Sequence, residues 1–557
     1  MKTVLFKMVM TSLLVLGAQS VFAASPLDEL AIQDKGRVKP LQSFAEETLQ
    51  LIHGKRTIKP HDSKDAKQAK VKREASEILL TFMLAPEQWI QNKIIVVDNL
   101  KLKKALGFEL DEKYFSLQDV LSSKHLQPLV QELDNKRKNE ETLNPFFEAL
   151  QKLEAQVGYI RYIQSGEAFR FVPPKTGDTW LHVHELEPEL QEKFSKVLAM
   201  FIEYISNKVQ QNDQVESSRV ALTAAVKDFK TAARAHNPEV YPKEKILDYE
   251  LTYNKLRPFR LAWIFYLVAF LGILFSWTLN QEWLYKISWV FSFMGLGVHA
   301  YGFVLRTLIS GRAPVSNMYE TVIWVPLGAM VFGMIIEMYL KNKFTILSAN
   351  LAAFLGLLVA SLAPTILDPS IQPLEAVLRS NFWLSTHVTT ITISYSAFFL
   401  AFVLGDINMV YFILSPKKWA KRIRTINDSI YRSVQIGVLL LAIGIVLGGV
   451  WADYSWGRFW GWDPKETWAL IALLGYLAVL HAKLVGWVKQ FGMSASAVAA
   501  FSLVIMAWYG VNYVLGKGLH SYGFGAGGVE YVSVFILLHF LLVGFAWFIK
   551  EKHIKAS

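Results

Sequence analysis

Nine apolar runs in the second half of the chain restrict its fold more than any other feature. Each is about twenty residues long, which is the length of a helix that crosses a membrane. The runs lie near 261–279, 287–308, 321–340, 345–364, 383–413, 433–450, 466–486, 495–515 and 529–549. Because a helix satisfies all its backbone polar groups within one segment, the sequence predicts an all-α fold, a polytopic transmembrane helix bundle. The fifth run is the longest, so we expect that helix to tilt or to protrude.

The N-terminus predicts export of the region that follows it. Residues 1–23 combine a basic start, a short apolar run and the ending Val21-Phe22-Ala23, which is typical of a secretory signal peptide. The alternative is an uncleaved first span, which the shortness of the run disfavours. Residues 24–257 are charged and show helical periodicity in three stretches, at 75–90, 189–210 and 216–235. We therefore expect an extracytoplasmic, mainly helical soluble domain at 24–257 and a transmembrane domain at 258–557.

Charge and cysteine content exclude several function classes. The formal net charge of +11 could indicate nucleic-acid binding, but in a membrane protein basic residues gather in inward-facing loops. With residues 24–257 outside, three predicted inner segments are basic: KNK at 341–343, the segment PKKWAKRIRT after Ser415, and the tail KEKHIK. We therefore expect a lipid bilayer of the cell inner (plasma) membrane and no nucleic acid. The absence of cysteine excludes disulfides and thiolate ligands.

The segment WADYSWGRFWGWDPKETW, residues 451–468, contains five of the seventeen tryptophans. It lies between two predicted spans, on the outer side by the same count of crossings. Flat aromatic rings can stack on a large flat ligand, and the glycines at 457 and 461 allow a close backbone approach. The alternative is a belt that anchors the chain among lipid headgroups. We favour the ligand platform, with Trp456, Trp460 and Trp462 as its rings.

The same segment also contains the start of a helix. Asp463 can cap the seventh predicted span, Pro464 suits the first helical position, and Glu466 completes a capping box. This accounts for the DPKE letters whatever the loop binds. The aromatic letters have no such complete structural explanation.

The string WGRFWGWDPKETW, residues 456–468, resembles the tryptophan-rich WWD motif of the cytochrome c assembly family, the haem-handling proteins of the CcsA/ResC type. The resemblance extends more loosely from about residue 290 to residue 550. It implies that this loop, Asp463 included, cradles haem on the outer side of the membrane. The family has one external histidine on each side of the loop, and His387 and His520 match them in order and local context. Two neutral imidazoles can bind a haem iron from opposite sides; the alternative is a histidine hydrogen-bonded to backbone.

The resemblance also implies two histidines within the membrane, where an ionisable group is costly and indicates a function. His481 matches one of them, and His299 matches the other in preference to its rival His539. His481 lies ~22 Å along its helix from Glu466, whereas His299 lies ~10 Å from Arg306, at 1.5 Å per residue. The alternative for each is a polar side chain hydrogen-bonded between helices.

The two propionates of haem require cations. Arg458 and Lys465 lie within the tryptophan segment. Arg312 lies in another predicted outer loop, SGRAPVSNMYE at 310–320, which also resembles the family. Arginine suits bidentate binding of carboxylates; contact with lipid headgroups is the alternative.

Together with these observations, the family resemblance implies a protein of cytochrome c-type biogenesis. It would bind haem b as its substrate, export or present it on the outer face, and assist its covalent attachment to apocytochrome c. The client would supply the thiols of a Cys-x-x-Cys-His sequence, a separate thiol reductant protein would keep them reduced, and a ResB/CcsB-type membrane protein would be the immediate partner. Whether this chain is itself part of a haem lyase stays open. The alternatives are a haem exporter or chaperone without ligase activity, and a transporter of another ligand in which histidines relay protons.

Overall fold

The computed structural model describes residues 25–58, 73–139, 141, 143–363, 366–374, 380–515 and 528–555. It divides into two compact units, Met1–Leu251 and Thr252–Ser557. The predicted signal peptide, residues 1–23, and the predicted ligand His520 lie outside the described residues.

The first unit is mainly helical. The predicted periodic stretches are helices in the structure, which confirms them, and they bury their apolar faces in one core. The helices are η1 (Pro26–Glu29), α2 (Leu41–His53), α3 (Ala75–Leu84), α4 (Pro86–Ile90), α5 (Leu100–Leu106), α6 (Leu117–Ser122), α7 (Leu126–Lys138), α8 (Pro145–Gln164), α9 (Pro188–Gln210) and α10 (Val215–His236). The strands form three antiparallel pairs: β1 (Ala31–Asp34) with β2 (Arg37–Pro40), β3 (Ile95–Val96) with β4 (Tyr114–Phe115), and β5 (Arg170–Val172) with β6 (Leu181–His182).

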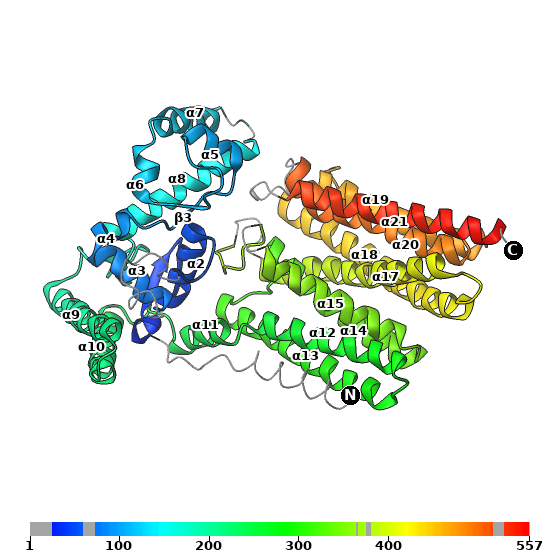
Figure 1. Cartoon of the computed structure of the whole chain (residues 1–557), viewed down its shortest axis with the longest axis horizontal. Helices are drawn as coiled ribbons and strands as arrows, with labels where there is room; N and C mark the ends of the chain where they lie inside the picture. Colours follow the sequence, from blue (N-terminus) through cyan, green and yellow to red (C-terminus); the bar gives the residue numbers. More distant parts are fainter. Residues whose placement is uncertain are drawn as a thin grey trace. The chain divides into compact units, whose positions relative to one another are not determined.

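The second unit is a bundle of long apolar helices (Figure 1). Nine helices of the described residues are long and apolar enough to cross a membrane, which confirms the predicted polytopic bundle. The elements after α11 (Glu244–Leu256) are α12 (Pro258–Thr278), α13 (Glu282–Ser310), α14 (Met318–Leu340), α15 (Phe344–Leu362), α16 (Asn381–Trp383), η4 (Leu384–Val388), α17 (Thr389–Leu414), α18 (Ala420–Trp456), α19 (Pro464–Leu484), α20 (Gln490–Ile505), η5 (Met506–Leu515) and α21 (Val529–Lys555).

Helix α17 is the centre of this bundle. It packs against α14, α15, α18, α20 and α21, and most of its apolar window is buried. Helix α21 lies at the periphery, where most of its apolar residues are exposed, as is usual for a lipid-facing helix.

Helix α18 is longer than the apolar run that predicted it. The run covers 433–450, whereas the helix runs from Ala420 to Trp456. The first turns of α18 have polar residues on one face and the buried residues Ile423, Ile426 and Ile430 on the other. This amphipathic stretch extends the helix beyond the apolar run. The predicted inner loop after Ser415 is therefore shorter than expected. The predicted outer loop is also shorter, residues 457–463, because Trp451 and Trp456 are helical.

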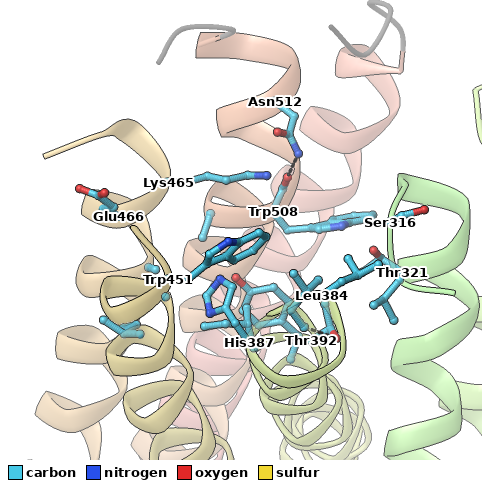
Figure 2. A pocket seen from close by; sticks show the side chains of 18 of the residues that line it. Ser316, Thr321, Leu384, His387, Thr392, Trp451, Lys465, Glu466, Trp508 and Asn512 are labelled. Carbon is cyan, nitrogen blue, oxygen red and sulfur yellow. Dashed lines mark hydrogen bonds between the residues drawn. The ribbon is translucent and has the colours of Figure 1, made fainter. Parts of the chain in front are cut away.

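Two segments depart from α-helical geometry. Both η4 and η5 are π-helices, and η4 connects α16 to α17 within the long fifth span. π-Helical turns are rare and often occur at functional sites. Both segments lie at the end of the bundle that carries the tryptophan segment, because α17 begins, α18 ends, α19 begins and η5 ends there (Figure 2).

Candidate functional site

A cavity of about 170 Å³ lies at this end of the bundle. Five parts of the chain line it: the start of α14, the segment from η4 into α17, the end of α18, the loop with the start of α19, and η5. Its lining is mainly apolar and aromatic, with a few polar groups, which is the usual composition of a small-molecule site. The residues that carry the argument below are Ser316, His387, Trp451, Phe459, Trp460, Lys465, Glu466, Trp508 and Asn512.

His387 is the histidine that lines the cavity among the described residues. Its Nδ1 lies 2.9 Å from the carbonyl oxygen of Gly444, so we assign the proton to Nδ1 and the lone pair to Nε2. Gly448 allows the ring to lie against α18, because a Cβ there would lie 2.6 Å from His387 Cε1. Trp451 packs edge-on to the imidazole at 5.7 Å between ring centroids. A backbone-held imidazole with its lone pair on the other nitrogen is the arrangement of metal-ligating histidines.

Of the three tryptophans predicted to form the platform, only Trp460 is among the residues that line the cavity. Trp460 lines the cavity, together with Phe459 and Trp451. Trp462 is 70% exposed and lies edge-on to Trp460, at 5.8 Å between ring centroids. Trp456 ends α18 and lies under the guanidinium of Arg458, 5.9 Å from the ring centroid. The cavity therefore takes one of the three predicted rings directly, plus Trp451.

Trp462 has a backbone conformation that a bulky residue rarely adopts. Its φ is +56°, in the left-handed region. The next residue, Asp463, caps α19: its Oδ1 accepts from the backbone N–H of Lys465 at 2.9 Å, and its own N–H donates to Glu466 Oε2 at 3.1 Å. The predicted capping box is confirmed, and it fixes the direction in which the loop leaves the helix.

The two glycines of the loop have internal explanations. Gly457 ends α18 with φ +68°. Gly461 lies against Arg458, since a Cβ there would lie 1.1 Å from Nη1. Arg458 pairs with Glu466 at 3.6 Å, and Glu466 Oε2 also accepts from the N–H of Gly461 at 2.8 Å. Gly457 thus supplies the left-handed turn that ends α18, whereas Gly461 makes room for an intraloop contact, and Arg458 is directed onto the loop.

Lys465 is the only lysine or arginine among the described lining residues. Figure 2 shows its side chain pointing from α19 toward η5, whereas Glu466 points away. On η5, Asn512 donates from Nδ2 to the carbonyl oxygen of Trp508 at 2.8 Å. Lys465, Trp508 and Asn512 form a polar corner in an otherwise mainly apolar and aromatic cavity.

A buried ion pair supports the opposite wall. Arg306 donates to Glu320 Oε1 at 2.7 Å, and both side chains are almost completely enclosed. Glu320 Oε2 accepts from the backbone N–H and the hydroxyl of Ser316, which lines the cavity. Arg312 is buried nearby and donates to the carbonyl oxygen of Gln372 at 2.8 Å; it is not among the described lining residues. Removing one partner of such a buried pair typically costs ~3–5 kcal/mol.

Three of the other predicted histidines, His299, His481 and His539, are not among the residues that line the cavity. His299 is fully buried in α13, with Nε2 2.9 Å from the carbonyl oxygen of Ile323 and Nδ1 3.3 Å from the hydroxyl of Tyr266. His481 is exposed on α19, with Nδ1 2.7 Å from the carbonyl oxygen of Leu477. Helix α13 packs on α12 and α14, whereas α19 packs on α18, α20 and η5.

His539, on α21, lies beside an acid of α17. Its Nε2 is 3.4 Å from Asp406 Oδ2, and its Nδ1 is 2.7 Å from the carbonyl oxygen of Phe535. The ring of Phe402 lies 4.8 Å from the imidazole, centroid to centroid.

Comparison with known proteins identifies the family. A family model described as Cytochrome C assembly protein matches residues 315–520. Cytochrome c biogenesis protein CcsA of Guillardia theta is 33% identical over 244 residues, which cover 39% of this chain and 79% of that protein. The chain belongs to the cytochrome c assembly family. The CcsA protein of Chlamydomonas reinhardtii is 36% identical over 226 residues, 39% of this chain and 62% of that protein.

A longer relative covers the soluble unit as well. Protein NrfI of Wolinella succinogenes is 28% identical over 528 residues, which cover 89% of this chain and 54% of NrfI. The chain thus spans about half the length of NrfI. With nine apolar helices among its described residues, this member of the cytochrome c assembly family is a multi-pass membrane protein.

The cavity and the family match coincide along the sequence. Every described residue that lines the cavity lies within the matched range of 315–520. His387 and His481 also lie within that range, whereas His299, Arg312 and His539 lie outside it. The family's matched region is therefore the part of the chain that builds the cavity.

The sequence analysis gave no site role to several cavity residues, among them Trp451, Trp508 and Asn512. Trp451 belongs to the tryptophan segment but was placed in a loop. Trp508 and Asn512 lie four residues apart near the end of an apolar run. An asparagine in such a run is itself a signal of function or of an interhelical contact.

Proposed function

We propose that this protein of cytochrome c-type biogenesis binds haem as its substrate in the cavity beside His387 and presents it for attachment to apocytochrome c. The observation that carries the proposal is the backbone-held imidazole of His387 in a cavity with walls of Trp451, Phe459 and Trp460. A neutral imidazole nitrogen is a common haem-iron ligand. Aromatic rings bind a flat macrocycle by stacking or edge contact.

Each part of the cavity has a role in this proposal. His387 supplies Nε2 to the iron, and the hydrogen bond from its Nδ1 to the Gly444 carbonyl keeps the ring oriented and makes it a better ligand. Trp451 and Trp460 cover the ring system and exclude water. The capping box at Asp463 and the contact between Arg458 and Gly461 hold the loop that carries Trp460.

The orientation in the membrane is part of the same proposal. The basic segments after Ser415 and at the C-terminal tail would face the cytoplasm, so the cavity would open on the outer side of the inner membrane. Residues 24–257 would be exported to that side. His520 would be the second axial ligand, as the family resemblance implies.

Attachment would proceed on the client. Each thiol of Cys-x-x-Cys-His adds across one vinyl group of haem, with the sulfur bonding one carbon and the proton going to the other, so no oxidant is consumed. The chain orients the substrate, while the addition belongs to haem and thiols. The client histidine would then replace one axial ligand. A ResB/CcsB-type membrane protein and a thiol reductant protein would be the partners.

The intramembrane histidines stay a prediction. His481, with His299 or its rival His539, would hold haem before it reaches the outer cavity. For His299, iron binding would replace the hydrogen bonds to Ile323 and Tyr266. Replacing His481 by alanine should lower the haem carried per protein; an unchanged ratio and spectrum would make it a packing or surface residue.

The experiment that tests the proposal is the absorption spectrum of the purified full-length protein. We expect a Soret band with bis-histidine character in the wild type. His387→Ala should lose most of it and should abolish cytochrome c maturation, with partial recovery in added imidazole. His125→Ala, an exposed histidine of the first unit, is the matched control. Normal cytochrome c levels in His387→Ala would refute the assignment.

A transporter of another ligand is the second candidate, favoured by one observation. The contact of His539 with Asp406 lies between two spans, and such pairs occur in proton relays. Absence of a Soret band in the wild type, together with proton-coupled uptake lost in Asp406→Asn, would favour this candidate.

A further inference from the structure

The polar corner of the cavity contains buried polar atoms with no protein partner. Asn512 is 8% exposed, and its Oδ1 is buried with no hydrogen-bond partner among the described residues. The indole Nε1 of Trp508 is in the same state. Both residues line the cavity. An unpaired buried polar atom typically costs ~1–3 kcal/mol, so two in one corner indicate that something else supplies their partners.

The amide of Asn512 is held in place. Its Nδ2 donates to the Trp508 carbonyl oxygen one turn earlier (Figure 2), which directs Oδ1 away from that bond. Trp508 therefore offers a donor and Asn512 an acceptor from adjacent turns of η5. The π-helical geometry of η5 sets the positions of these two side chains.

Lys465 adds the positive charge. It is the second residue of α19, where the helix dipole further favours an anion. The other cation of the loop, Arg458, is directed to Glu466. The corner thus combines an ammonium, an indole N–H and an amide oxygen, while the rest of the cavity is aromatic or apolar.

We infer that this corner, made of Lys465, Trp508 and Asn512, binds one propionate carboxylate of the haem. The inference rests on the proposed function and names the part of the substrate that each end of the cavity recognises. The carboxylate accepts from the Lys465 ammonium and from Trp508 Nε1–H. The three donors of the ammonium suffice for the carboxylate and for Asn512 Oδ1. Of the three predicted propionate cations, Lys465 lines the cavity among the described residues, whereas Arg458 pairs with Glu466 and Arg312 donates to the Gln372 carbonyl oxygen.

The test compares two porphyrins that differ only in the carboxylates. Full-length protein in nanodiscs of zwitterionic lipid is titrated with haem and with haem dimethyl ester, and both dissociation constants are read from the Soret shift. We expect the wild type to prefer the free acid by about tenfold, the size expected of one charge-assisted hydrogen bond. Lys465→Met should lose that preference while binding the ester like the wild type, and Trp508→Phe should lose part of it.

The controls separate this inference from the proposed function. Lys483→Met, at the other end of α19, should keep the wild-type preference. Unchanged affinity for the ester in Lys465→Met shows that the variant is folded. If the wild type binds both porphyrins equally, or Lys465→Met keeps the preference, the inference is refuted and haem binding stands. If the wild type binds neither porphyrin, the proposed function and the inference both fail.

Discussion

Replacing Gly448 by alanine should damage the proposed haem site while leaving the helix intact. A Cβ at this position would lie 2.6 Å from Cε1 and 3.0 Å from Nδ1 of His387, closer than any stable contact. The backbone of α18 cannot retreat without disturbing its packing on α17. The imidazole must therefore move, and its 2.9 Å hydrogen bond to the Gly444 carbonyl must lengthen or break.

The expected effects on helix and site have opposite signs. In a helix interior, alanine is favoured over glycine by roughly 1 kcal/mol, so helix propensity alone predicts an equally or more stable protein. Crowding in a packed interior typically costs about 1–3 kcal/mol, and a displacement of about 1 Å at a reacting group can lower a rate by ~10²-fold. We expect near-normal protein abundance, a strongly reduced Soret band per protein, and cytochrome c maturation lowered by at least about tenfold.

The assay is haem occupancy at matched protein abundance, with stained c-type cytochrome as the functional readout. Gly297→Ala is the matched control, because it also lies within a predicted membrane helix and a Cβ there would meet nothing within 4 Å. Wild-type occupancy and spectrum in Gly448→Ala would show that iron binding does not depend on where His387 lies against α18, and the proposed ligand geometry would be wrong.

Three further predictions concern the loop and the first unit. Trp460→Ala should lower haem occupancy more than Trp462→Ala, because of these two residues only Trp460 lines the cavity. Equal losses in the two variants would instead support the predicted platform that includes Trp462. Asp463→Ala removes the cap of α19, which should cost ~1 kcal/mol and speed amide exchange at the helix start, measured by mass spectrometry. Burial raises the pKa of the Asp28 carboxyl to about 7, against a lowering by its hydrogen bond from Ser76. Since the unfolded carboxyl ionises near pH 4, its contribution to stability is full below pH ~4 and is lost as the pH rises toward and past 7. Amide hydrogen exchange of the peptide around η1, corrected for intrinsic rates, should therefore become faster as the pH rises over that range. In Asp28→Asn the corrected exchange rate should not change with pH. Equal pH dependence in the wild type and the variant would refute the raised pKa of Asp28.

Hydropathy predicted the membrane helices because each must be apolar over a full bilayer thickness. It failed at the start of α18, where the buried residues Ile423, Ile426 and Ile430 recur at helical spacing among polar residues and no continuous apolar run exists. The π-helices were not predictable either. The π-helical turns at His387 and Trp508 depend on how these segments pack against neighbouring helices, and no residue type predicts a π-helical turn.

The site was predicted only as far as residue type indicates chemistry. His387 followed from the resemblance, and the capping box of Asp463 followed from local spacing alone. The polar corner was missed because Trp508 and Asn512 lie within an apolar run, where their role depends on Lys465, which is remote in sequence. For His299, the sequence shows only that a histidine lies inside a membrane helix; that both its ring nitrogens have partners depends on α12 and α14.

The two explanations of the tryptophan segment, helix cap and ligand platform, are compatible, because different residues of the segment would serve each. One set contacts the loop itself and defines its shape: Gly457, Arg458, Gly461, Asp463 and Glu466. A second set, interleaved with the first, lines the cavity: Phe459, Trp460 and Lys465, together with Glu466, which belongs to both sets. A substitution at a residue of the first set that does not line the cavity should change haem affinity only by moving the second set. Haem binding in Asp463→Ala should then recover when the loop is stabilised by a different cap, such as Asp463→Ser or Asp463→Asn, which keep a side-chain acceptor at the N-cap. Recovery in these variants would show that the aspartate acts through the loop, whereas loss in all three would require a direct contact of the Asp463 carboxylate with the substrate.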